Sequence, residues 1–507
     1  MQIVWFKRDI RIVDNAALKS ALATGDSILP LYILEPSLWR QPDMSQRHYL
    51  FLHESLTELA HALEQRGCPL IIRIGEAVDV LEQLRQQFPL TGLWSHQETG
   101  NGWTFQRDKH VLSWARQHGI AWHEPTQHGV IRRLKNRDGW AARWYKQMAA
   151  PLLPAPSALP PLPAAIQSDA LPTPQALKLV DDGCVERQQG GRTAGLNLLK
   201  TFLQQRGVRY TREMSSPVLA FEACSRLSPH LSFGTLSLRE VFQATEQRVH
   251  LLHGVSKEER GTWGGSLRSF SGRLRWHCHF MQKLEDAPRI EFENFHSAYN
   301  GLRENDFNKT HFTAWKTGNT GYPMIDACMR ALIATGWLNF RMRAMLMSFA
   351  SYHLWLHWRE TALHLARLFT DYEAGIHYSQ AQMQSGTTGI NAIRIYNPIK
   401  QGLDQDPNGV FIRKWVPELR DMPQSLLHTP WVRPDLCGAY PLPIVEEKAA
   451  RQQAAARIYA QRKGQNYRAE SKAIVEKHGS RKAGLPQQTV KKSRKVSVSP
   501  LQQELPL

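Results

Sequence analysis

The sequence predicts a two-part fold, with an α/β domain built on a doubly wound parallel sheet followed by an all-α domain. Two observations predict it. Over residues 1–130, short apolar runs alternate with helix-length amphipathic stretches, which is the pattern of strands joined by helical crossovers. From about residue 192 to residue 445, apolar residues recur at three- and four-residue spacing, which indicates packed helices.

The predicted strands of the first domain are four short apolar runs. They are QIVWF at 2–6, ILPLYIL at 28–34, PLIIRIG at 69–75 and GLWSH at 92–96. The turn after the first run reads KRDIRIVDN and lacks the GxGxxG pattern that dinucleotide-binding domains carry at this point. An α/β domain of this kind therefore need not bind a nucleotide.

A connector is predicted at 131–191, where the composition changes. Residues 150–174, APLLPAPSALPPLPAAIQSDALPTP, are rich in proline. Because proline fixes φ and removes a backbone donor, neither a long helix nor a central strand is expected there.

The helical domain at 192–445 has its strongest pattern in TGYPMIDACMRALIATGW and RMRAMLMSFASYHLWLHWRE, whose aromatic and methionine residues are first of all candidates for the core. Residues 446–507 form a basic tail. An Ala- and Gln-rich helix candidate is followed there by KKSRKVSVSPLQQELPL, for which we expect disorder.

The charge balance favours a polyanionic partner such as nucleic acid. The chain has 507 residues and a formal net charge of +18. Residues 446–507 contain 14 basic and 5 acidic side chains, so half of the surplus lies in the tail and half in the body.

The cysteines and the N-terminus favour a soluble cytoplasmic protein without a membrane partner. The six cysteines contain no CxxC pair, which argues against zinc ribbons, a local iron–sulfur run and a disulfide scaffold. The opening MQIVWFKRDIRIVD becomes charged after six residues and leaves no room for the apolar region of a signal peptide, and no apolar run reaches membrane-spanning length.

Polar clusters interrupt the helical half. CSRLSPHLSFGTLS at 224–237 could hold phosphate through backbone N–H groups and Arg226, although a pair of ordinarily capped helices explains it as well. RLRWHCHF at 273–280 suits a stacked base and its phosphates better than a metal, which would need a third converging ligand, so no metal site is predicted. Arg343 and Asp371 could form a buried charge pair. The stretch that Asp371 opens, DYEAGIHYSQAQMQ at 371–384, could also be a solvated loop.

Four motifs together carry a resemblance to a known family. They are VWFKRDIRIVDNAAL, SRLSPHLSFGTLS, TGYPMIDACMRALIATGW, and IRIYNP with DPNGVFIRKWVPEL. In this order, over residues 1 to about 440, they resemble the signatures of the DNA photolyase/cryptochrome flavoproteins. The resemblance implies an N-terminal α/β domain, a helical domain that binds bent FAD, and a basic face that admits a flipped-out pyrimidine dimer. It also implies that reduced flavin, excited by blue or near-ultraviolet light, passes an electron to the dimer.

The resemblance also implies roles for individual residues. The catalytic group that it implies is Arg343, Asp371, His377 and Trp358. The implied FAD-binding residues are Tyr210, Cys224, Ser225, Arg226, Leu227, Ser228, Trp337, Asp371, Tyr372, Glu373 and His377. The implied DNA-binding residues are Arg273, Trp276, His277 and Arg394. His377 takes the position that faces the flavin N5, and Trp276 that of the lesion-stacking tryptophan.

Three departures from the family pattern are visible. Arg273 stands where many repair enzymes carry a glutamate that hydrogen-bonds the lesion. Asn339-Phe340-Arg341 replaces the usual His-Asn-Arg. In the electron-feeding tryptophan chain Trp358 matches the middle member, whereas Ala381 and Asn305 stand at the other two positions. Photoreduction then needs another route, for which the candidates are Trp355, Tyr378 and Tyr396.

The leading expectation is therefore a light-driven, FAD-dependent photolyase that binds DNA containing pyrimidine dimers as a monomer in the cytoplasm. The alternatives are a cryptochrome-like photoreceptor with the basic tail as its signalling element, and a flavin-free nucleic-acid-binding protein. HQETGNGWTFQRD at 96–108 lies where the family often seats a second pigment, so a folate, a deazaflavin and an empty groove stay open. The choice between cyclobutane and (6-4) lesions also stays open.

Overall fold

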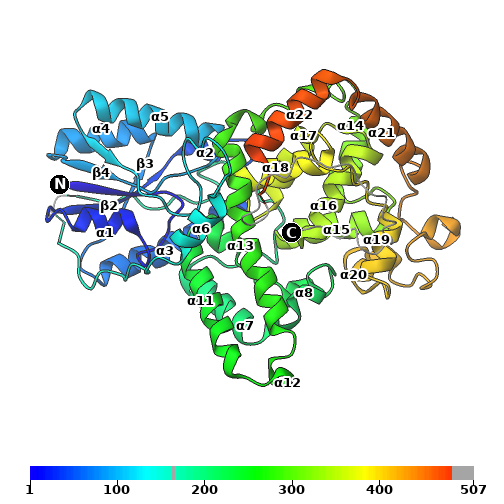
Figure 1. Cartoon of the computed structure of the whole chain (residues 1–507), viewed down its shortest axis with the longest axis horizontal. Coiled ribbons are helices and arrows are strands. Elements are labelled where there is room, and N and C mark those ends of the chain that lie inside the picture. The colour runs from blue at the N-terminus through cyan, green and yellow to red at the C-terminus, as the bar shows by residue number, and fades with distance from the viewer. Residues whose placement is uncertain (163–165, 482–507) are drawn as a thin grey trace.

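The computed structural model describes residues 1–162 and 166–481 and confirms the doubly wound α/β domain (Figure 1). Its sheet has five parallel strands in the order β3-β2-β1-β4-β5. The strands are β1 (Gln2–Phe6), β2 (Ile28–Leu34), β3 (Ile71–Ile74), β4 (Gly92–Trp94) and β5 (Ala121–His123). The first four lie in the predicted runs, whereas β5 was not predicted because its three residues are partly exposed and too few to show a pattern.

Helices cover both faces of this sheet, which is why its strands are apolar on both sides. They are α1 (Ala16–Leu22), α2 (Pro36–Trp39), α3 (Gln46–Glu64), α4 (Ala77–Gln87) and α5 (Gly102–Gln117). Val4 and Phe6 of β1 share a core with α1 and α3, while Ile3 and Trp5 share another with α4 and α5. Figure 1 shows these two helix pairs above and below the strands.

One helix, α6 (Trp140–Met148), lies within the predicted connector. It buries Trp140, Trp144 and Met148, which follow one another at four-residue spacing. The described residues between α6 and α7 form no further helix or strand, as their proline content predicts.

The second domain is all-α, as predicted. Its helices are α7 (Arg192–Gln204), α8 (Tyr210–Glu213), α9 (Ala220–Ala223), α10 (Ser228–Ser232), α11 (Leu238–Leu251), α12 (Lys257–Arg260), α13 (Trp263–Asp286), α14 (Lys309–Thr317), α15 (Pro323–Thr335), α16 (Phe340–Ser348), α17 (Trp358–Leu368), α18 (Ala374–Ser385), α19 (Pro398–Gln405) and α20 (Val410–Trp415). Short helical turns include η3 (Pro288–Glu291), η4 (Ser297–Tyr299) and the π-helical η5 (Phe349–His353). The long α13 runs between the two halves of the molecule in Figure 1.

Two of the sequence motifs pack against each other and join the domains. Arg8, after β1, donates from Nε to the carbonyl of Ser232 at 2.9 Å, and Arg11 donates to the carbonyl of Gly234 at 2.8 Å. Gly234 has φ +69°, and a Cβ there would collide with the carbonyl of Arg8. The turn that replaces the dinucleotide fingerprint therefore serves as a domain interface.

Arg47 of α3 makes a second junction between the domains. Its side chain is fully buried and donates to the carboxylate of Asp182 at 2.8 Å. It also donates to the carbonyls of Leu332, near the end of α15, at 3.1 Å and Leu368, at the end of α17, at 2.7 Å. The carbonyl of Leu332 also accepts from the N–H of Gly336 at 2.9 Å, so Arg47 adds a second hydrogen bond there and ties the ends of both helices to the α/β domain.

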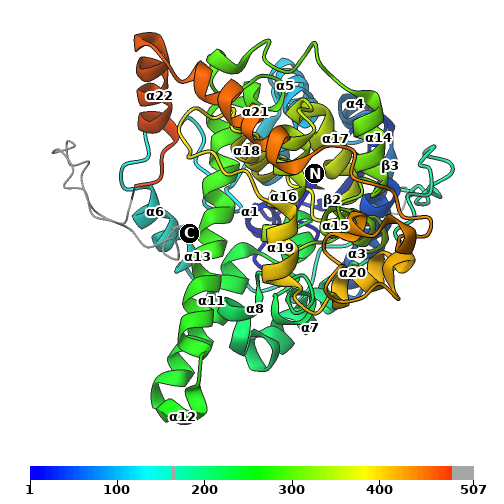
Figure 2. The ribbon, with the colours of Figure 1, turned by 90° about the vertical axis from the view of Figure 1, so that its right-hand side faces the viewer.

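The tail begins with two helices, α21 (Glu447–Gln461) and α22 (Gln465–His478), which run along the outside of the helical domain (Figure 2). Tyr467 donates to the carbonyl of Gly389 at 2.8 Å, and Glu470 accepts from the N–H of Ser297 at 2.8 Å. The segment KKSRKVSVSPLQQELPL, for which disorder was predicted, lies outside the described residues. Among the described helices, none combines the length and the apolar character needed to cross a membrane.

Candidate functional site

Arg343 and Asp371 form the centre of the site. Arg343 lies on α16 and Asp371 in the short loop between α17 and α18. The guanidinium donates to both carboxylate oxygens, at 2.9 and 2.8 Å, and its Nε donates to the carbonyl of Leu338 at 2.7 Å. A bidentate pair of this kind fixes both side chains in one geometry.

Asp371 stays ionised although its carboxylate is only 4% exposed. Burial by itself would raise the pKa of Asp371, but Arg343 lowers it by charge and by hydrogen bonding, and Ser228 and Arg226 add to the lowering. The net pKa is below the ordinary value. The 224–228 segment therefore lies close enough to this loop for both to belong to one site.

Arg226 is a half-buried cation without an acidic partner in the part of the chain that the structure describes. It has φ +60°, and its guanidinium lies 4.3 Å from the ring centroid of Trp337 and 5.0 Å from that of Phe221. Its Nε has no hydrogen-bond partner, and burial lowers the pKa of Arg226 to about 10. An unpaired guanidinium held in this way is suited to bind an anion.

The surroundings of Cys224 extend this positive region. Burial raises the pKa of the Cys224 thiol to about 12, and the arginines around it act in the opposite direction. These arginines are Arg226, Arg273, Arg206 and Arg343. Two carboxylates oppose them: Asp371 is in ion-pair contact with Arg343, and Glu222 acts by charge on Arg206. The surplus of positive charge fits the diphosphate of FAD, so the residues present suit the cofactor that the resemblance implies.

The other predicted members of the 224–228 segment and its neighbours line the same region. Leu227 is buried, and its N–H lies 3.4 Å from the hydroxyl of Ser225. Tyr210 packs edge-on against Phe202 and Phe270, and burial raises its pKa to about 12. Tyr210 therefore stays a neutral donor at physiological pH.

His377 is held in one tautomer. Its Nε2 lies 2.7 Å from the carbonyl of Ala362, and because a carbonyl only accepts, Nε2 carries the proton. Burial lowers the pKa of His377 to about 4, so the ring is neutral at physiological pH. The remaining nitrogen, Nδ1, is therefore a hydrogen-bond acceptor.

The α/β domain holds the backbone of Tyr372 and the side chain of Glu373. Arg8 donates to the carbonyl of Tyr372 at 2.9 Å and lies 3.7 Å from the carboxylate of Glu373. The hydroxyl of Tyr372 donates to Asp43 at 2.7 Å. Neither Arg8 nor Asp43 was predicted as a site residue. The signal for Arg8 was its place directly after the first strand, at the edge of the sheet where doubly wound folds place functional residues.

The predicted DNA contacts on α13 have different surroundings. Trp276 is half-buried beside His279 and Phe280, at centroid distances of 4.7 and 5.5 Å. The Nε of Arg273 has no partner in the described chain, and its guanidinium lies 5.8 Å from the ring of Phe340. Burial, followed by the charge of Arg8, lowers the pKa of His277 to about 4. A neutral histidine that lies toward the α/β domain is a poor phosphate ligand, so His277 is left out of the contacts proposed below.

Arg394 lies in the loop between α18 and α19. Its carbonyl accepts a hydrogen bond from the hydroxyl of Ser348 at 3.1 Å, while its guanidinium has no hydrogen bond or ion pair to any described residue. The side chain is half-buried and remains free to contact a ligand.

Trp358 is fully buried and donates from Nε1 to Asn294 at 2.8 Å. Its nearest aromatic neighbour toward the Asp371 loop is Tyr378, at a centroid distance of 6.5 Å. At the two positions where the family pattern has tryptophans, Ala381 lies in the core and Asn305 is exposed.

Trp355, another candidate for an electron route, has two cations on its ring. Arg303 lies 4.5 Å and Arg457 4.9 Å from its centroid. Since nearby positive charge disfavours removal of an electron, this arrangement argues against Trp355 as a donor.

The segment 96–108 is bound to the protein's own groups. His96 pairs with Asp9 at 2.6 Å, and Thr99 donates to Glu285 at 2.7 Å. The N–H of Gly102 donates to Glu291 at 2.6 Å. The segment therefore bridges the two domains.

Within residues 1–162 and 166–481, no group of three His, Cys, Asp or Glu side chains is arranged to hold a metal.

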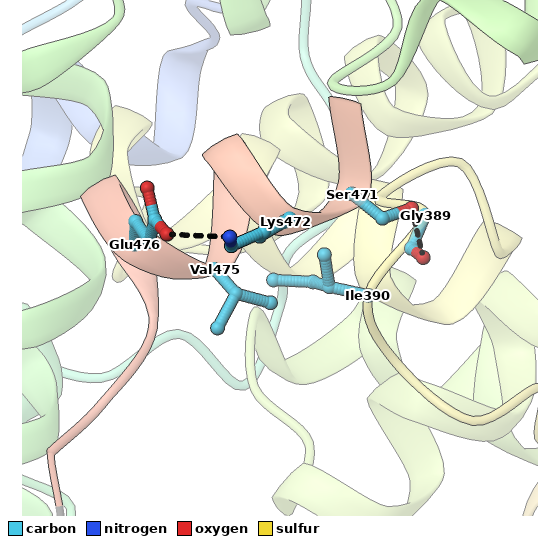
Figure 3. Close-up of a pocket in the computed structure, with 6 residues that line it drawn as sticks. All are labelled: Gly389, Ile390, Ser471, Lys472, Val475 and Glu476. Atoms are coloured by element: carbon cyan, nitrogen blue, oxygen red, sulfur yellow. Dashed lines mark hydrogen bonds and ion pairs between the residues drawn. The ribbon is translucent and has the colours of Figure 1, made fainter. Parts of the chain in front are cut away.

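A surface pocket of about 370 Å³ lies apart from this site, between α22 and the loop at Gly389 and Ile390 (Figure 3). It contains none of the predicted site residues.

Comparisons with known proteins agree with this geometry. Residues 2–166 match the family model described as DNA photolyase, and residues 270–460 match that of the FAD binding domain of DNA photolyase. A deoxyribodipyrimidine photo-lyase from Streptomyces griseus is 30% identical over 468 residues, covering 89% of this chain and 97% of that protein. Cryptochrome DASH from Gloeobacter violaceus is 26% identical over 85% of this chain and 88% of that protein. The crystal structure of a bacterial class III photolyase from Agrobacterium tumefaciens superposes with a TM-score of 0.79 at 26% identity, covering 91% of this chain and 98% of that one.

Proposed function

Because the chain belongs to the DNA photolyase/cryptochrome family, we propose that it is a light-driven, FAD-dependent lyase that repairs pyrimidine dimers in DNA. The observation that carries this proposal is the ionised Arg343–Asp371 pair next to the unpaired guanidinium of Arg226. Reduced FAD bound in this site would supply the electron that splits the dimer.

The residues around the site would hold the cofactor and set its electrostatics. Arg226 and the 224–228 segment would bind the diphosphate, with Trp337 and Tyr210 as apolar walls. The Arg343–Asp371 pair and neutral His377 would present a fixed arrangement of charge and of one acceptor nitrogen to the ring system. Arg8 would keep the loop of Tyr372 and Glu373 in position from the α/β domain.

DNA binding would use a stacking residue and separate phosphate contacts. Trp276 would stack on the flipped lesion. A damaged and poorly stacked dimer costs the least to extrude from the duplex, and this low cost would favour damaged DNA. Arg394 would contact a backbone phosphate, and each such contact would make binding weaker at high salt. Arg273, which replaces the usual lesion-contacting glutamate, would meet the lesion or its phosphates as a cation.

The test is a repair assay with purified protein in which the flavin has been reduced. Oligonucleotides with a single cyclobutane dimer or a single (6-4) product are illuminated with blue light, and restored pyrimidines are measured by chromatography. Repair of either lesion in light and not in the dark supports the proposal. Flavin-loaded protein that restores neither lesion contradicts it.

A blue-light receptor without repair activity is the second candidate. The observation that favours it is the packing of α22 on the loop of Gly389, which is continuous with Arg394. In such a receptor, light would change the hydrogen exchange of residues 447–478. Exchange that is the same in light and in the dark would count against this candidate and leave the repair proposal untouched.

A further inference from the structure

A cluster of buried basic side chains lies away from the candidate site, where the segment before α6 meets α13 and α22. It consists of Arg137 from that segment, His279 and Lys283 from α13, and His478 from α22, and none of them is more than 7% exposed. We call these four residues the basic cluster. Among the described residues, the only carboxylate in ion-pair contact with it is Asp286, which lies 3.4 Å from one nitrogen of Arg137.

Arg137 is the least satisfied member of the cluster. Its side chain is 2% exposed, and none of its three nitrogens has a hydrogen-bond partner in the described chain. Asp286 already accepts a hydrogen bond from Gln282 at 2.9 Å, and the ring of Trp140 lies 5.7 Å from the guanidinium. A guanidinium offers five N–H donors, and leaving them unpaired in the interior is costly.

Lys283 is a second buried cation without an acidic partner. Its Nζ lies 5.0 Å from the ring centroid of Phe280 and makes no hydrogen bond or ion pair with any described residue. Burial, followed by the charge of Arg137, lowers the pKa of Lys283 to about 8. At neutral pH two buried positive charges therefore face one carboxylate, Asp286.

The two histidines supply hydrogen-bonding groups and no negative charge. Burial, followed by Arg137 and Lys283, lowers the pKa of His478 to about 3, and the pKa of His279 is also far below its usual range. Nδ1 of His478 has no partner among the described residues. Three further cations lie around the cluster, namely Lys477, Arg289 and Arg481. Two of them have a carboxylate partner, because Arg289 lies 3.4 Å from Glu293 and Arg481 lies 3.0 Å from Asp138.

We propose that the basic cluster binds a small oxyanion of the phosphate class, held by Arg137, Lys283 and His478. The planar guanidinium matches the oxygens of a tetrahedral anion, and the anion would balance the surplus charge. The backbone of a nucleic acid cannot be the ligand, because every member of the cluster is at least nine-tenths buried. Since the ligands come from α13 and α22, the bound anion would fasten the C-terminal helix to the body.

The first experiment uses the full-length, flavin-loaded protein and hydrogen exchange of residues 465–478. Inorganic phosphate is titrated at constant ionic strength, with chloride as the balancing anion. Exchange in α22 should slow by about tenfold at saturation, because an anion bound to the docked helix opposes local opening. Lys283→Met, which keeps the apolar stem and removes the charge, should abolish the effect. The control is Lys472→Met, because Lys472 lies on α22 with a side chain 80% exposed.

The proposal is supported if the response is lost in Lys283→Met and kept in Lys472→Met. It is overturned if wild-type protein shows no response, or if Lys283→Met responds as strongly as wild type. A second measurement covers the case in which Lys283→Met does not fold. Sulfate, whose charge is constant over this range, should bind wild-type protein more weakly at pH 9.5 than at pH 7 because Lys283 loses its proton. Equal affinity at the two pH values would overturn the proposal.

Discussion

The guanidinium of Arg8 lies 3.7 Å from the carboxylate of Glu373, although the two residues belong to different domains. Arg8 also donates to the neighbouring carbonyl of Tyr372. Burial raises the pKa of Glu373 to about 7, while Arg8 acts to lower it. The α/β domain therefore controls both the position and the ionisation of the loop that we assign to FAD.

Arg8→Met should weaken FAD binding by at least about tenfold, equivalent to about 1.4 kcal/mol, because the loop loses a hydrogen bond and a charge partner. Flavin fluorescence during dialysis measures this loss. Arg8→Lys keeps the charge without the forked geometry and should fall between wild type and Arg8→Met. If all three proteins retain FAD equally well, Arg8 does not contribute to cofactor binding.

Asp371→Asn should leave Arg343 without its anion and shift both the absorption spectrum and the redox potential of the bound flavin. Because the pKa of Asp371 is lowered in the folded state, this carboxylate stabilises the protein above its unfolded pKa of 3.8, and the contribution is lost as the pH falls. As the pH falls below this value, the free energy of unfolding should therefore decrease less in the variant than in wild type. Spectroelectrochemistry and urea unfolding at several pH values check the two effects, and an unchanged potential would contradict the role of the pair.

Glu291→Gln tests a buried carboxyl outside the catalytic group. Burial raises the pKa of Glu291 to about 7, against the opposing hydrogen bond from Gly102. The folded state then binds an extra proton between the unfolded pKa of 4.5 and pH 7, so this group makes wild type less stable as the pH rises through that window. Between pH 4.5 and pH 7 the free energy of unfolding of Glu291→Gln, relative to that of wild type, should rise by up to about 3 kcal/mol. If urea unfolding shows the same difference between the two proteins at every pH, the raised pKa of Glu291 is refuted.

Trp276 and Arg394 should differ in what they contribute to DNA binding. Trp276→Ala should lose discrimination for damage, because stacking of a base on an aromatic ring is worth about 1–3 kcal/mol. Arg394→Ala should weaken binding to damaged and undamaged DNA alike and reduce the salt dependence. Fluorescence anisotropy at several salt concentrations separates the two patterns, and equal losses for both variants on both DNAs would refute the division.

Trp358→Phe should slow the light-driven reduction of bound flavin, because Trp358 is linked to the Asp371 loop through Tyr378, which lies 6.5 Å from Trp358 and 6.4 Å from Tyr372 of that loop. Trp355→Phe is the matched control, since two guanidinium groups on its ring disfavour loss of an electron. Illumination with an external reductant, followed by absorption, gives both rates. A larger effect of Trp355→Phe would reverse the assignment.

Much of the fold could be predicted from the sequence because its strands and helices differ in period. The first four strands are apolar on both faces and stand out, whereas β5 has three partly exposed residues and leaves no such signal. Helix α6 was hidden by the prolines that follow it, although Trp140, Trp144 and Met148 show the spacing of a buried helical face. Local patterns thus gave the elements that bury the most apolar surface.

The candidate site was predictable to the extent that its residues stand in motifs. Arg343 and Asp371 were expected as a pair, and the structure brings them into contact. Arg8 and Asp43 were missed because their partners lie more than 300 residues away in the chain. The burial of His277 likewise depends on how α13 meets the α/β domain, which no local pattern reveals.

The close approach of Gly234 to the carbonyl of Arg8 bears on how this protein could be recombined with its relatives. A chimera that exchanges only one half would place a foreign 7–15 turn against the native 232–235 segment, where any side chain at 234 meets backbone. Exchanges that carry both segments together should yield intact hybrids, and the two stretches are expected to change in concert during evolution.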